Sequence, residues 1–300
     1  MRILISGSSG LIGRAVVAHL VAQGHQITRL VRGGPSADRP AVYWDPLAEY
    51  LDPLPLEGFD AVIHLAGENI AARRWTPQQK DRIYRSRVQG TKLLSKTLAH
   101  LNRKPRVFLS ASAVGYYGNR GDQLVDETAP AGSGFLATVA RDWEEATAPA
   151  GEAQIRTVIL RFGAVLSVEG GILPRLIPVF RWGLGGVLGP GTQYVSWVSL
   201  SDVLRVVSFL LTREDISGPV NITAPEPVTN RQLTKALARV LRRPAVFWVP
   251  AFALRMMLGE MAHELLLCSI RAIPRKLEQA GFTFQDREFE PTVRQLLAGK

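Results

Sequence analysis

One stretch near the N-terminus decides the fold, and it reads Ile3-Leu4-Ile5-Ser6-Gly7-Ser8-Ser9-Gly10-Leu11-Ile12-Gly13. A short apolar strand leads into a G-x-x-G-x-x-G turn, in which Ser8 stands where the common G-x-G-x-x-G form has its second glycine. Such glycines allow a tight turn and a close approach to a pyrophosphate, which the N–H groups of the following helix then face. We therefore expect a dinucleotide-binding turn, rather than a purely structural one, with contacts from Gly7, Ser9, Gly10, Leu11, Ile12 and Gly13.

Apolar runs and helix-period segments alternate outward from this turn, which favours a parallel sheet with helices on both faces. The expected strands are Ile3–Ser6, Gln26–Val31, Ala61–Leu65, Val107–Ser110 and Thr157–Arg161. The expected helices between them are Leu11–Gln23, Pro77–Leu101 and Phe135–Ala148. The fold class is α/β, a Rossmann-type doubly wound parallel sheet with a smaller, mainly helical C-terminal lobe.

The amino-acid composition changes in the second half of the chain. Residues 167–197 are rich in glycine and proline and carry Phe180, Trp182, Tyr194 and Trp197, which is typical of a lid or binding segment. A helix over Asp202–Leu211 capped by Ser199 or Ser201, a strand over Pro219–Thr223 and a helix opened by a capping box at 229–232 follow. We expect a Rossmann domain at 1–166 plus about 198–222, and a lid and substrate-side lobe at 167–197 and 223–300. The lid aromatics, with Trp248 and Phe252, either line a pocket or fill the small core.

The end of the second strand indicates which dinucleotide is bound. An NAD site normally has an acid about 20 residues past the glycines, to accept the ribose hydroxyls. The segment 28–34 holds Arg29 and Arg32, and the first acid is Asp38. A guanidinium binds a 2′-phosphate that a carboxylate would repel, so we expect NADP(H), with Arg32 as the first contact and Arg29 as the second.

Composition excludes several classes of protein. No run approaches the roughly 20 apolar residues of a membrane span, and the best stretch, Ala251–Leu267, is amphipathic and expected to be packed. No export signal is visible and Cys268 is the single cysteine, expected to be buried and inert, so we expect a cytoplasmic protein. The net charge of +10 is dispersed, which makes nucleic acid an unlikely partner, and no membrane partner is expected. The five histidines lack metal-ligand spacing; His64 is expected to be buried and hydrogen-bonded, and the pair at 126–127 to be a solvated turn.

Further blocks carry a resemblance along essentially the whole chain. They are His64-Leu65-Ala66-Gly67-Glu68-Asn69-Ile70, Arg73-Arg74-Trp75, Ser86-Arg87-Val88-Gln89-Gly90-Thr91, Ser110-Ala111-Ser112-Ala113-Val114-Gly115-Tyr116-Tyr117-Gly118, Leu160-Arg161-Phe162-Gly163-Ala164-Val165-Leu166, Ser196-Trp197-Val198 with Asp202, and Asn221-Ile222-Thr223-Ala224-Pro225-Glu226-Pro227. The chain resembles the extended short-chain dehydrogenase/reductases, and more closely the atypical NAD-dependent epimerase-like proteins with their own C-terminal domain.

The resemblance implies further cofactor contacts. Leu65, Ala66 and Gly67 would line the adenosine and ribose side, and the alternative for Leu65 is core packing. Arg87 stands where extended relatives usually have Asn near the cofactor, or is a surface charge. Ser110 would join these contacts, and Phe162 would lie near the nicotinamide or pack in the core.

The usual catalytic pair is missing. Enzymes of this superfamily use Tyr-x-x-x-Lys on one helix face, where the ammonium lowers the pKa of the tyrosine for proton exchange. Phe135 and Val139 stand in these two places, and no tyrosine in the chain has a lysine four residues on. Ser112 matches the serine that orients the substrate oxygen, and Tyr116 or Tyr117 is the candidate replacement acid.

Three interpretations therefore stay open. The first is an NADP(H)-dependent oxidoreductase or epimerase-like enzyme with an atypical active site and an unknown small-molecule substrate. The second is a non-catalytic NADP(H)-binding regulator or sensor. The third, based on the positive charge alone, is a protein associated with nucleic acid. Because hydride chemistry belongs to the cofactor, a site that only positions substrate can retain activity, which favours the first. The oligomeric state is not predicted.

Overall fold

The computed structural model describes residues 1–33 and 40–298 of the chain. These residues form two compact units. Unit 1 consists of Met1–Ser112, Val139–Leu160 and Leu204–Val220, and unit 2 of Ala113–Thr138, Arg161–Val203 and Asn221–Lys300. The domain boundaries expected from the sequence stay a prediction.

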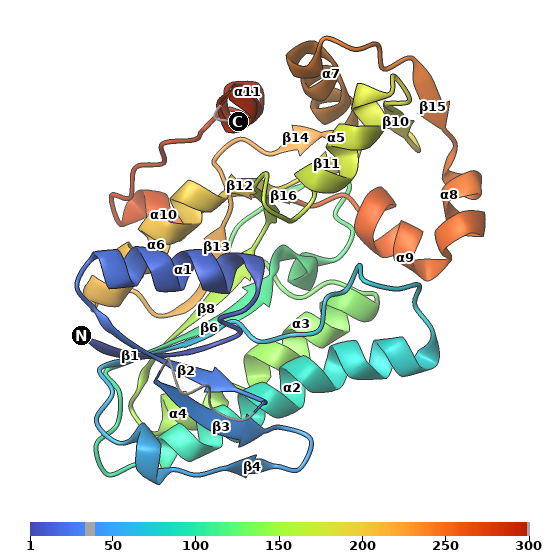
Figure 1. Cartoon of the computed structure of the whole chain (residues 1–300). Coiled ribbons are helices and arrows are strands. Elements are labelled where there is room, and N and C mark those ends of the chain that lie inside the picture. Colours follow the sequence, from blue (N-terminus) through green and yellow to red (C-terminus); the bar gives the residue numbers. More distant parts are fainter. Residues whose placement is uncertain (34–39, 299–300) are drawn as a thin grey trace. The chain divides into compact units, whose positions relative to one another are not determined.

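Unit 1 is built on an eight-stranded sheet (Figure 1). The order is β13-β8-β6-β5-β1-β2-β3-β4, and β3, β2, β1, β5 and β6 pair in parallel. The strands are β1 (Arg2–Ser6), β2 (Gln26–Val31), β3 (Ala41–Asp45), β4 (Tyr50–Leu51), β5 (Ala61–His64), β6 (Val107–Ala113), β8 (Arg156–Phe162) and β13 (Gly218–Ile222). The chain progresses in one direction from β1 to β3 and in the other from β5 to β13, so the order reverses between β1 and β5. Open α/β sheets bind their ligands at such a reversal, outside the carboxyl ends of the strands.

Helices cover both faces of this sheet, because its central strands are apolar on both sides. Figure 1 shows α1 (Leu11–Ala22) on one face and α2 (Pro77–Ala99) with α4 (Ala148–Glu152) on the other. On the α2 face, Leu4, Val62 and Phe108 pack with Leu94 and Leu98 in one buried cluster. α3 (Phe135–Glu145) and α6 (Leu200–Thr212) each begin in unit 2 and end in unit 1. The doubly wound α/β fold expected from the sequence is confirmed.

Unit 2 combines short helices with two-stranded pairings. β10 pairs with β15, β12 with β9 and β16 with β7 in parallel, whereas β11 and β14 are antiparallel. The strands are β7 (Leu124–Val125), β9 (Ala164–Leu166), β10 (Gly186–Leu188), β11 (Tyr194–Val195), β12 (Trp197–Ser199), β14 (Val228–Thr229), β15 (Phe247–Val249) and β16 (Arg271–Ala272). The helices are α5 (Leu173–Arg181), α7 (Asn230–Leu241), α8 (Ala251–Leu258), α9 (Glu260–Ala262), α10 (Arg275–Gln279) and α11 (Phe289–Ala298), with the helical turns η2 (Val114–Tyr117) and η3 (His263–Leu267).

Two local predictions for this part of the chain are confirmed and one is wrong. The capping box at the start of α7 is present, with the Thr229 and Gln232 side chains each bonded to the backbone of the other. Ser199 Oγ accepts a hydrogen bond from the N–H of Asp202 at 3.1 Å, as expected at the start of α6. The expectation of a long loop over 167–197 is wrong, because this stretch contains α5 and the strands β10 and β11. Its role as a lid or binding segment stays a prediction.

Candidate functional site

The glycine turn between β1 and α1 has the geometry of a phosphate cradle. Gly7 has φ +68°, and a Cβ there would lie 2.5 Å from the backbone carbon of Leu65. A Cβ on Gly13 would lie 2.2 Å from the carbonyl oxygen of Gly7, so α1 packs directly on the turn. Gly10 begins α1 without a side-chain cap, and this leaves the first N–H groups of the helix available to a ligand. Gly7 and Gly13 are thus required for two different steric reasons, whereas Gly10 serves as the uncapped start of α1.

The arginines at the end of β2 lie where the sequence places them. Arg29 is half-buried within β2, and Arg32 is exposed one residue beyond its end. β2 is paired with β1, the strand that leads into the glycine turn. Asp38, the first acid after β2, lies outside the described residues. Binding of a 2′-phosphate by Arg32 stays a prediction.

The segment after β5 is held from two sides. The Leu65 N–H donates to Ser6 Oγ at 3.2 Å. On the other side, Arg87 Nη1 donates to the carbonyl oxygens of Glu68 at 2.9 Å and Ile83 at 3.2 Å. Gly67 lies against this guanidinium, since a Cβ on it would be 3.3 Å from the Arg87 Cζ. The Arg87 side chain therefore supports the backbone at 65–68.

Arg87 is not a plain surface charge. Its guanidinium carbon lies 5.0 Å from the centre of the Trp143 ring, in a cation–π contact. Burial lowers the pKa of Arg87 to about 10, which still leaves the side chain charged at neutral pH. Direct contact between Arg87 and a cofactor stays a prediction.

A chain of buried hydrogen bonds lies beneath the glycine turn. His64 Nδ1 is 2.6 Å from Ser6 Oγ, and His64 Nε2 is 2.9 Å from Thr91 Oγ1. Trp143 Nε1 donates to the same threonine oxygen at 2.8 Å. Burial lowers the pKa of His64 to about 4, so the imidazole is neutral at pH 7. The expectation that His64 is buried and hydrogen-bonded is confirmed.

Strand β6 carries two serines, Ser110 and Ser112, separated by one residue. Ser110 is fully buried beside His64 of β5, and its Oγ has no hydrogen-bond partner among the described residues. Ser112 Oγ donates to Glu144 Oε1 of α3 at 2.7 Å. This serine–carboxylate pair could not be predicted from the sequence, because the two residues are 32 positions apart. Val139, in the place of the usual lysine, is buried in an apolar setting.

The two tyrosines of η2, in unit 2, have different environments. Tyr117 is fully buried; its hydroxyl donates to Asn221 Oδ1 at 2.7 Å and accepts from Arg161 Nη1 at 2.9 Å. Burial raises the pKa of Tyr117 to about 12. Tyr116 is half-buried, and the Arg161 guanidinium carbon lies 3.6 Å above the centre of its ring. Tyr117 is therefore engaged on both sides, whereas Tyr116 is stacked on a cation.

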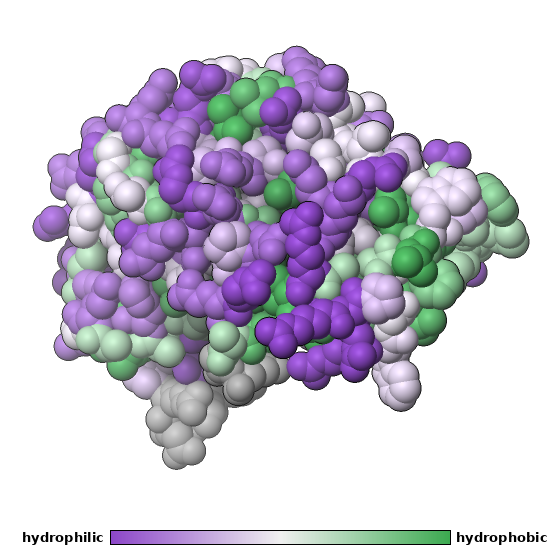
Figure 2. Space-filling view, turned by 90° about the horizontal axis from the view of Figure 1, so that it is seen from above, coloured by the Kyte–Doolittle hydropathy of each residue, from purple (hydrophilic) through white to green (hydrophobic). Residues whose placement is uncertain are grey.

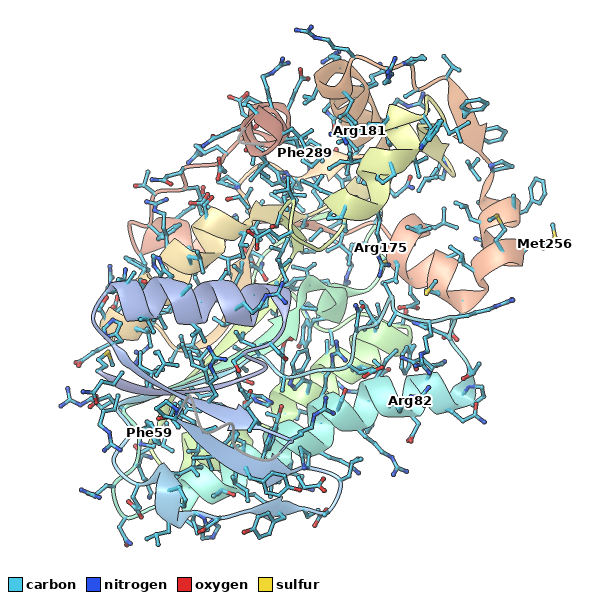
Figure 3. All side chains as sticks on the ribbon, viewed as in Figure 1. Phe59, Arg82, Arg175, Arg181, Met256 and Phe289 are labelled. Atoms are coloured by element: carbon cyan, nitrogen blue, oxygen red, sulfur yellow. The ribbon has the colours of Figure 1, made fainter. Side chains whose placement is uncertain are left out.

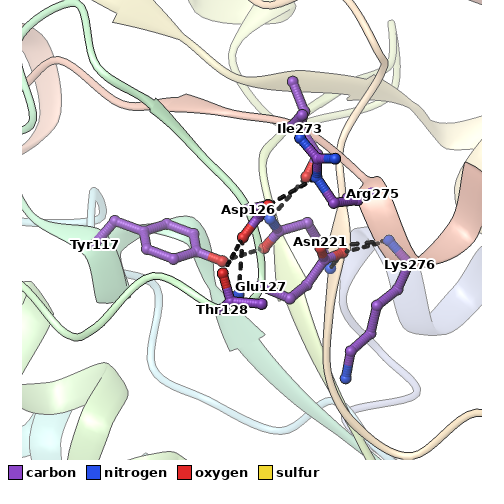
Figure 4. A network of polar contacts seen from close by, with 8 residues as sticks. All are labelled: Tyr117, Asp126, Glu127, Thr128, Asn221, Ile273, Arg275 and Lys276. Atoms are coloured by element: carbon purple, nitrogen blue, oxygen red, sulfur yellow. Dashed lines mark hydrogen bonds and ion pairs between the residues drawn. The ribbon is translucent and has the colours of Figure 1, made fainter.

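Asn221 connects this pair to a buried carboxylate (Figure 4). Its N–H donates to Glu127 Oε1 at 3.0 Å, and its side-chain nitrogen donates to the carbonyl oxygen of Ile273 at 2.9 Å. Glu127 also accepts from the backbone N–H of Lys276 at 3.4 Å, and burial raises its pKa. The expectation of a solvated turn at 126–127 is wrong for Glu127, which is 6% exposed, because distant backbone donors hold its carboxylate inside.

Other expected features are placed as follows. Phe162, at the end of β8, is half-buried, and its proximity to a nicotinamide stays a prediction. Cys268 is half-buried, and burial raises the pKa of its thiol to about 12.

No group of three or more His, Cys, Asp or Glu side chains suited to a metal ion occurs in the described ranges. None of the helices in this part of the chain has the length and apolar character that crossing a bilayer takes.

Known proteins match this architecture over the whole chain. An "Epimerase family protein Mb2239" from Mycobacterium bovis is 46% identical over 282 residues, which are 94% of this chain and 93% of that protein. The crystal structure of the human epimerase family protein SDR39U1 (isoform 2) with NADPH is 29% identical, with a TM-score of 0.90 and full coverage of both chains. The crystal structure of a nucleoside-diphosphate sugar epimerase from Corynebacterium glutamicum is 36% identical, with a TM-score of 0.83; this chain spans 59% of that one.

Two family profiles match separate segments of the sequence. Residues 249–296 match a domain of unknown function, DUF1731, which confirms the expected C-terminal domain. Residues 3–223 match the NAD dependent epimerase/dehydratase family. The chain belongs to the NAD dependent epimerase/dehydratase family.

Proposed function

We propose that this chain binds NADP(H) in the cradle of unit 1 and uses it to reduce or epimerise a small-molecule substrate. The observation that carries the proposal is the glycine turn, where missing Cβ atoms at Gly7 and Gly13 make room for close backbone packing beside an uncapped helix end. Family membership supports the choice of a nicotinamide dinucleotide.

The residues present fit such a cofactor. The N–H groups at the start of α1 would bind the pyrophosphate, and the backbone at 65–67 would line the adenosine side. Ser110, in the middle of β6 and opposite the last residue of β5, has a buried hydroxyl without a hydrogen-bond partner among the described residues, which a ligand group would satisfy. When bound, the cofactor supplies hydride transfer at its nicotinamide ring.

Selection of NADP(H) over NAD(H) rests on charge. Arg29 lies within β2 and Arg32 one residue beyond its end, where an NAD site would have a carboxylate. A guanidinium forms short, charge-assisted hydrogen bonds with a phosphate, so a 2′-phosphate would be attracted to this corner. The human relative whose structure contains NADPH supports the same choice.

Two side chains are candidates for handling the substrate proton. Ser112 already donates to Glu144, so the pair can pass a proton between a hydroxyl and a carboxylate. Tyr116 offers a phenol whose ring is stacked on the Arg161 cation. We leave Tyr117 out of this role, because its hydroxyl is occupied by Asn221 and Arg161 and its raised pKa opposes proton exchange at neutral pH.

A second candidate function is a non-catalytic NADP(H) sensor. It is favoured by the burial of Tyr117 and by Val139 in the apolar place of the usual lysine. The two functions differ in turnover. An enzyme oxidises NADPH, followed by its absorbance, with some member of a panel of carbonyl compounds and nucleotide sugars, and loses this activity in Ser112→Ala or Tyr116→Phe. A sensor binds NADPH equally well and turns over none of the panel.

The binding proposal is tested by titrating NADPH and NADH against wild type and Arg32→Ala. Loss of a charge-assisted phosphate contact should weaken NADPH binding by about 1–3 kcal/mol, or roughly 5–150-fold, and leave NADH binding unchanged. Arg103→Ala is the matched control, since Arg103 is also exposed but precedes β6 and lies at the amino ends of the strands. An unchanged preference for NADPH over NADH in Arg32→Ala would overturn the assignment of Arg32, and failure of wild type to bind either dinucleotide would overturn the whole proposal.

A further inference from the structure

Unit 2 exposes an unusual number of large apolar side chains. They lie in two segments, one at the end of α5 and in the loop that follows, and the other on β15 and α8. We call them the apolar surface, and its members are Val179, Trp182, Leu184, Val246, Phe247, Trp248, Phe252, Met256 and Met257. Trp182 is 82% exposed and Trp248 is 65% exposed, although tryptophan is normally well buried. Figure 2 shows hydrophobic residues gathered at the right-hand edge, on the side where Figure 1 places α8 and β15.

Backbone pairing brings the two segments together. β10, which follows Leu184, pairs in parallel with β15, with Val187 opposite Trp248. Trp248 Nε1 donates to the carbonyl oxygen of Gly189 at 2.6 Å, so the indole is anchored at its polar end while its ring faces solvent. The exposure of these residues is thus a feature of ordered structure.

Helix α8 continues the surface. Leu254 is its buried side chain, whereas Phe252, Met256 and Met257 are each about two-thirds exposed or more. Figure 3 shows Met256 pointing away from the helix into solvent. The expectation that the stretch from Ala251 is amphipathic and packed is therefore wrong for α8, because only a narrow strip of this helix is buried.

Positive charge accompanies these apolar groups. The segments 171–190 and 242–259 contain five arginines and no Asp or Glu. All five are exposed, and they are Arg175, Arg181, Arg242, Arg243 and Arg255. Arg181 is adjacent to Trp182, and Arg255 is adjacent to Met256. The surface therefore suits a partner that is both apolar and anionic.

We propose that the apolar surface binds the face of an anionic lipid bilayer. Tryptophan, phenylalanine and methionine side chains insert at the boundary between headgroups and acyl chains, and arginines bind the lipid phosphates. A second copy of this chain is disfavoured, because a self-complementary contact would bring together two sets of five exposed arginines, whereas the two segments themselves contain no acid and Glu260 lies only at the end of the second. This proposal departs from the sequence-based expectation of no membrane partner. Binding to the face of a bilayer needs no spanning helix, so it is compatible with the absence of one among the described residues.

Sedimentation with lipid vesicles tests the proposal on the full-length protein. Wild type should bind vesicles of phosphatidylcholine with phosphatidylglycerol at least 10-fold more tightly than vesicles of phosphatidylcholine alone, and added salt should weaken the binding. The double variant Arg242→Gln/Arg243→Gln should lose about 10–30-fold on the anionic vesicles. The double variant Trp182→Ser/Trp248→Ser should lose at least as much.

Control variants remove equal charge, and an equal number of exposed apolar side chains, elsewhere on the chain. Arg103→Gln/Arg294→Gln and Leu47→Ser/Leu54→Ser alter exposed residues outside the apolar surface and should bind as wild type does. Equal binding of wild type to both kinds of vesicle would overturn the proposal. Equal losses of vesicle affinity in the variants of the apolar surface and in the control variants would also overturn it. A change in oligomeric state caused by the patch variants, without lipid, would assign the surface to a protein contact instead and would also overturn it.

Intrinsic fluorescence of wild type provides a test that needs no variant. Of the six tryptophans, Trp44, Trp143 and Trp197 are buried, and Trp75 is half-buried in unit 1, outside the apolar surface. The exposed Trp182 and Trp248 should therefore give most of the spectral response to vesicles. Anionic vesicles should shift the emission to the blue, and lipids brominated near the headgroup should quench it. An emission spectrum unaffected by either would contradict insertion of these side chains.

Discussion

Replacement of Gly7 by alanine tests the steric basis of the cradle. Gly7 has φ +68°, a conformation that costs an L-residue roughly 1–2 kcal/mol. The new methyl group would also lie 2.5 Å from the carbonyl carbon and oxygen of Leu65 and 2.7 Å from the N of Ala66. These are backbone atoms at the end of β5, so relief requires the turn to move away from the sheet. Overpacking of this kind costs about 1–3 kcal/mol, which gives about 2–5 kcal/mol in total.

The variant Gly24→Ala separates the conformational cost of the positive φ from the steric cost of the added methyl group. Gly24 has φ +82°, but a Cβ there meets nothing within 4 Å, so this variant should lose only the conformational part. The difference between the two variants is then the contact with Leu65, about 1–3 kcal/mol, or roughly 2–12 °C in the midpoint of thermal unfolding measured by circular dichroism. Gly10→Ala has ordinary backbone angles and a nearest contact of 3.4 Å, and should melt close to wild type. If Gly7→Ala melted no lower than Gly24→Ala, the close approach of the turn to β5 would be refuted.

Two further predictions concern buried polar groups. Folding lowers the pKa of His64 from 6.5 to about 4, so between these pH values the unfolded chain binds a proton that the folded chain does not. The free energy of unfolding should therefore fall by about 3 kcal/mol as the pH drops through this window. Urea unfolding of the variant His64→Gln should lack that loss. Parallel pH profiles for the two proteins would contradict this reasoning. Tyr117→Phe leaves Asn221 Oδ1 without its donor and should lose about 1–3 kcal/mol of unfolding free energy in urea, whereas the exposed Tyr43→Phe should stay within about 0.5 kcal/mol of wild type; equal stabilities would argue against the buried contact.

Six of the eight strands of the central sheet were predictable because their signals are local, whereas β3 and β4 were not expected. β5 reads as an unbroken apolar run, and the glycine turn follows directly on β1, so both could be read from adjacent residues. The capping box at Thr229 is likewise contained within four positions. By contrast, α5 begins near Pro174, contains Pro178 and lies in a glycine-rich stretch, which locally favours irregular structure. It forms because Leu173, Ile177 and Phe180 are buried in a core with residues of α7 and α11 that no window of sequence brings together.

The residues of the candidate site also fall into those marked by local sequence and those defined by distant contacts. Gly7, Gly13 and the arginines of β2 have a motif or a strand end to mark them. Glu127 and Arg161 do not: the carboxylate is held by backbone donors at positions 221 and 276, and the guanidinium is stacked on a tyrosine 45 residues earlier in the chain. Their roles arise only when the fold is complete. Chemistry carried by contacts between distant segments leaves no spacing pattern to read.

The single cysteine has a practical consequence. With a thiol pKa of about 12, Cys268 is a thiolate in roughly one molecule in 10⁵ at pH 7, and the thiolate is the reactive form. Maleimide dyes should therefore leave it unmodified while reacting with a cysteine introduced at an exposed position. Spin labels or fluorophores can thus be attached at two introduced cysteines, one in each unit, without first removing the native sulfur, and the distance between the two labels becomes measurable in solution.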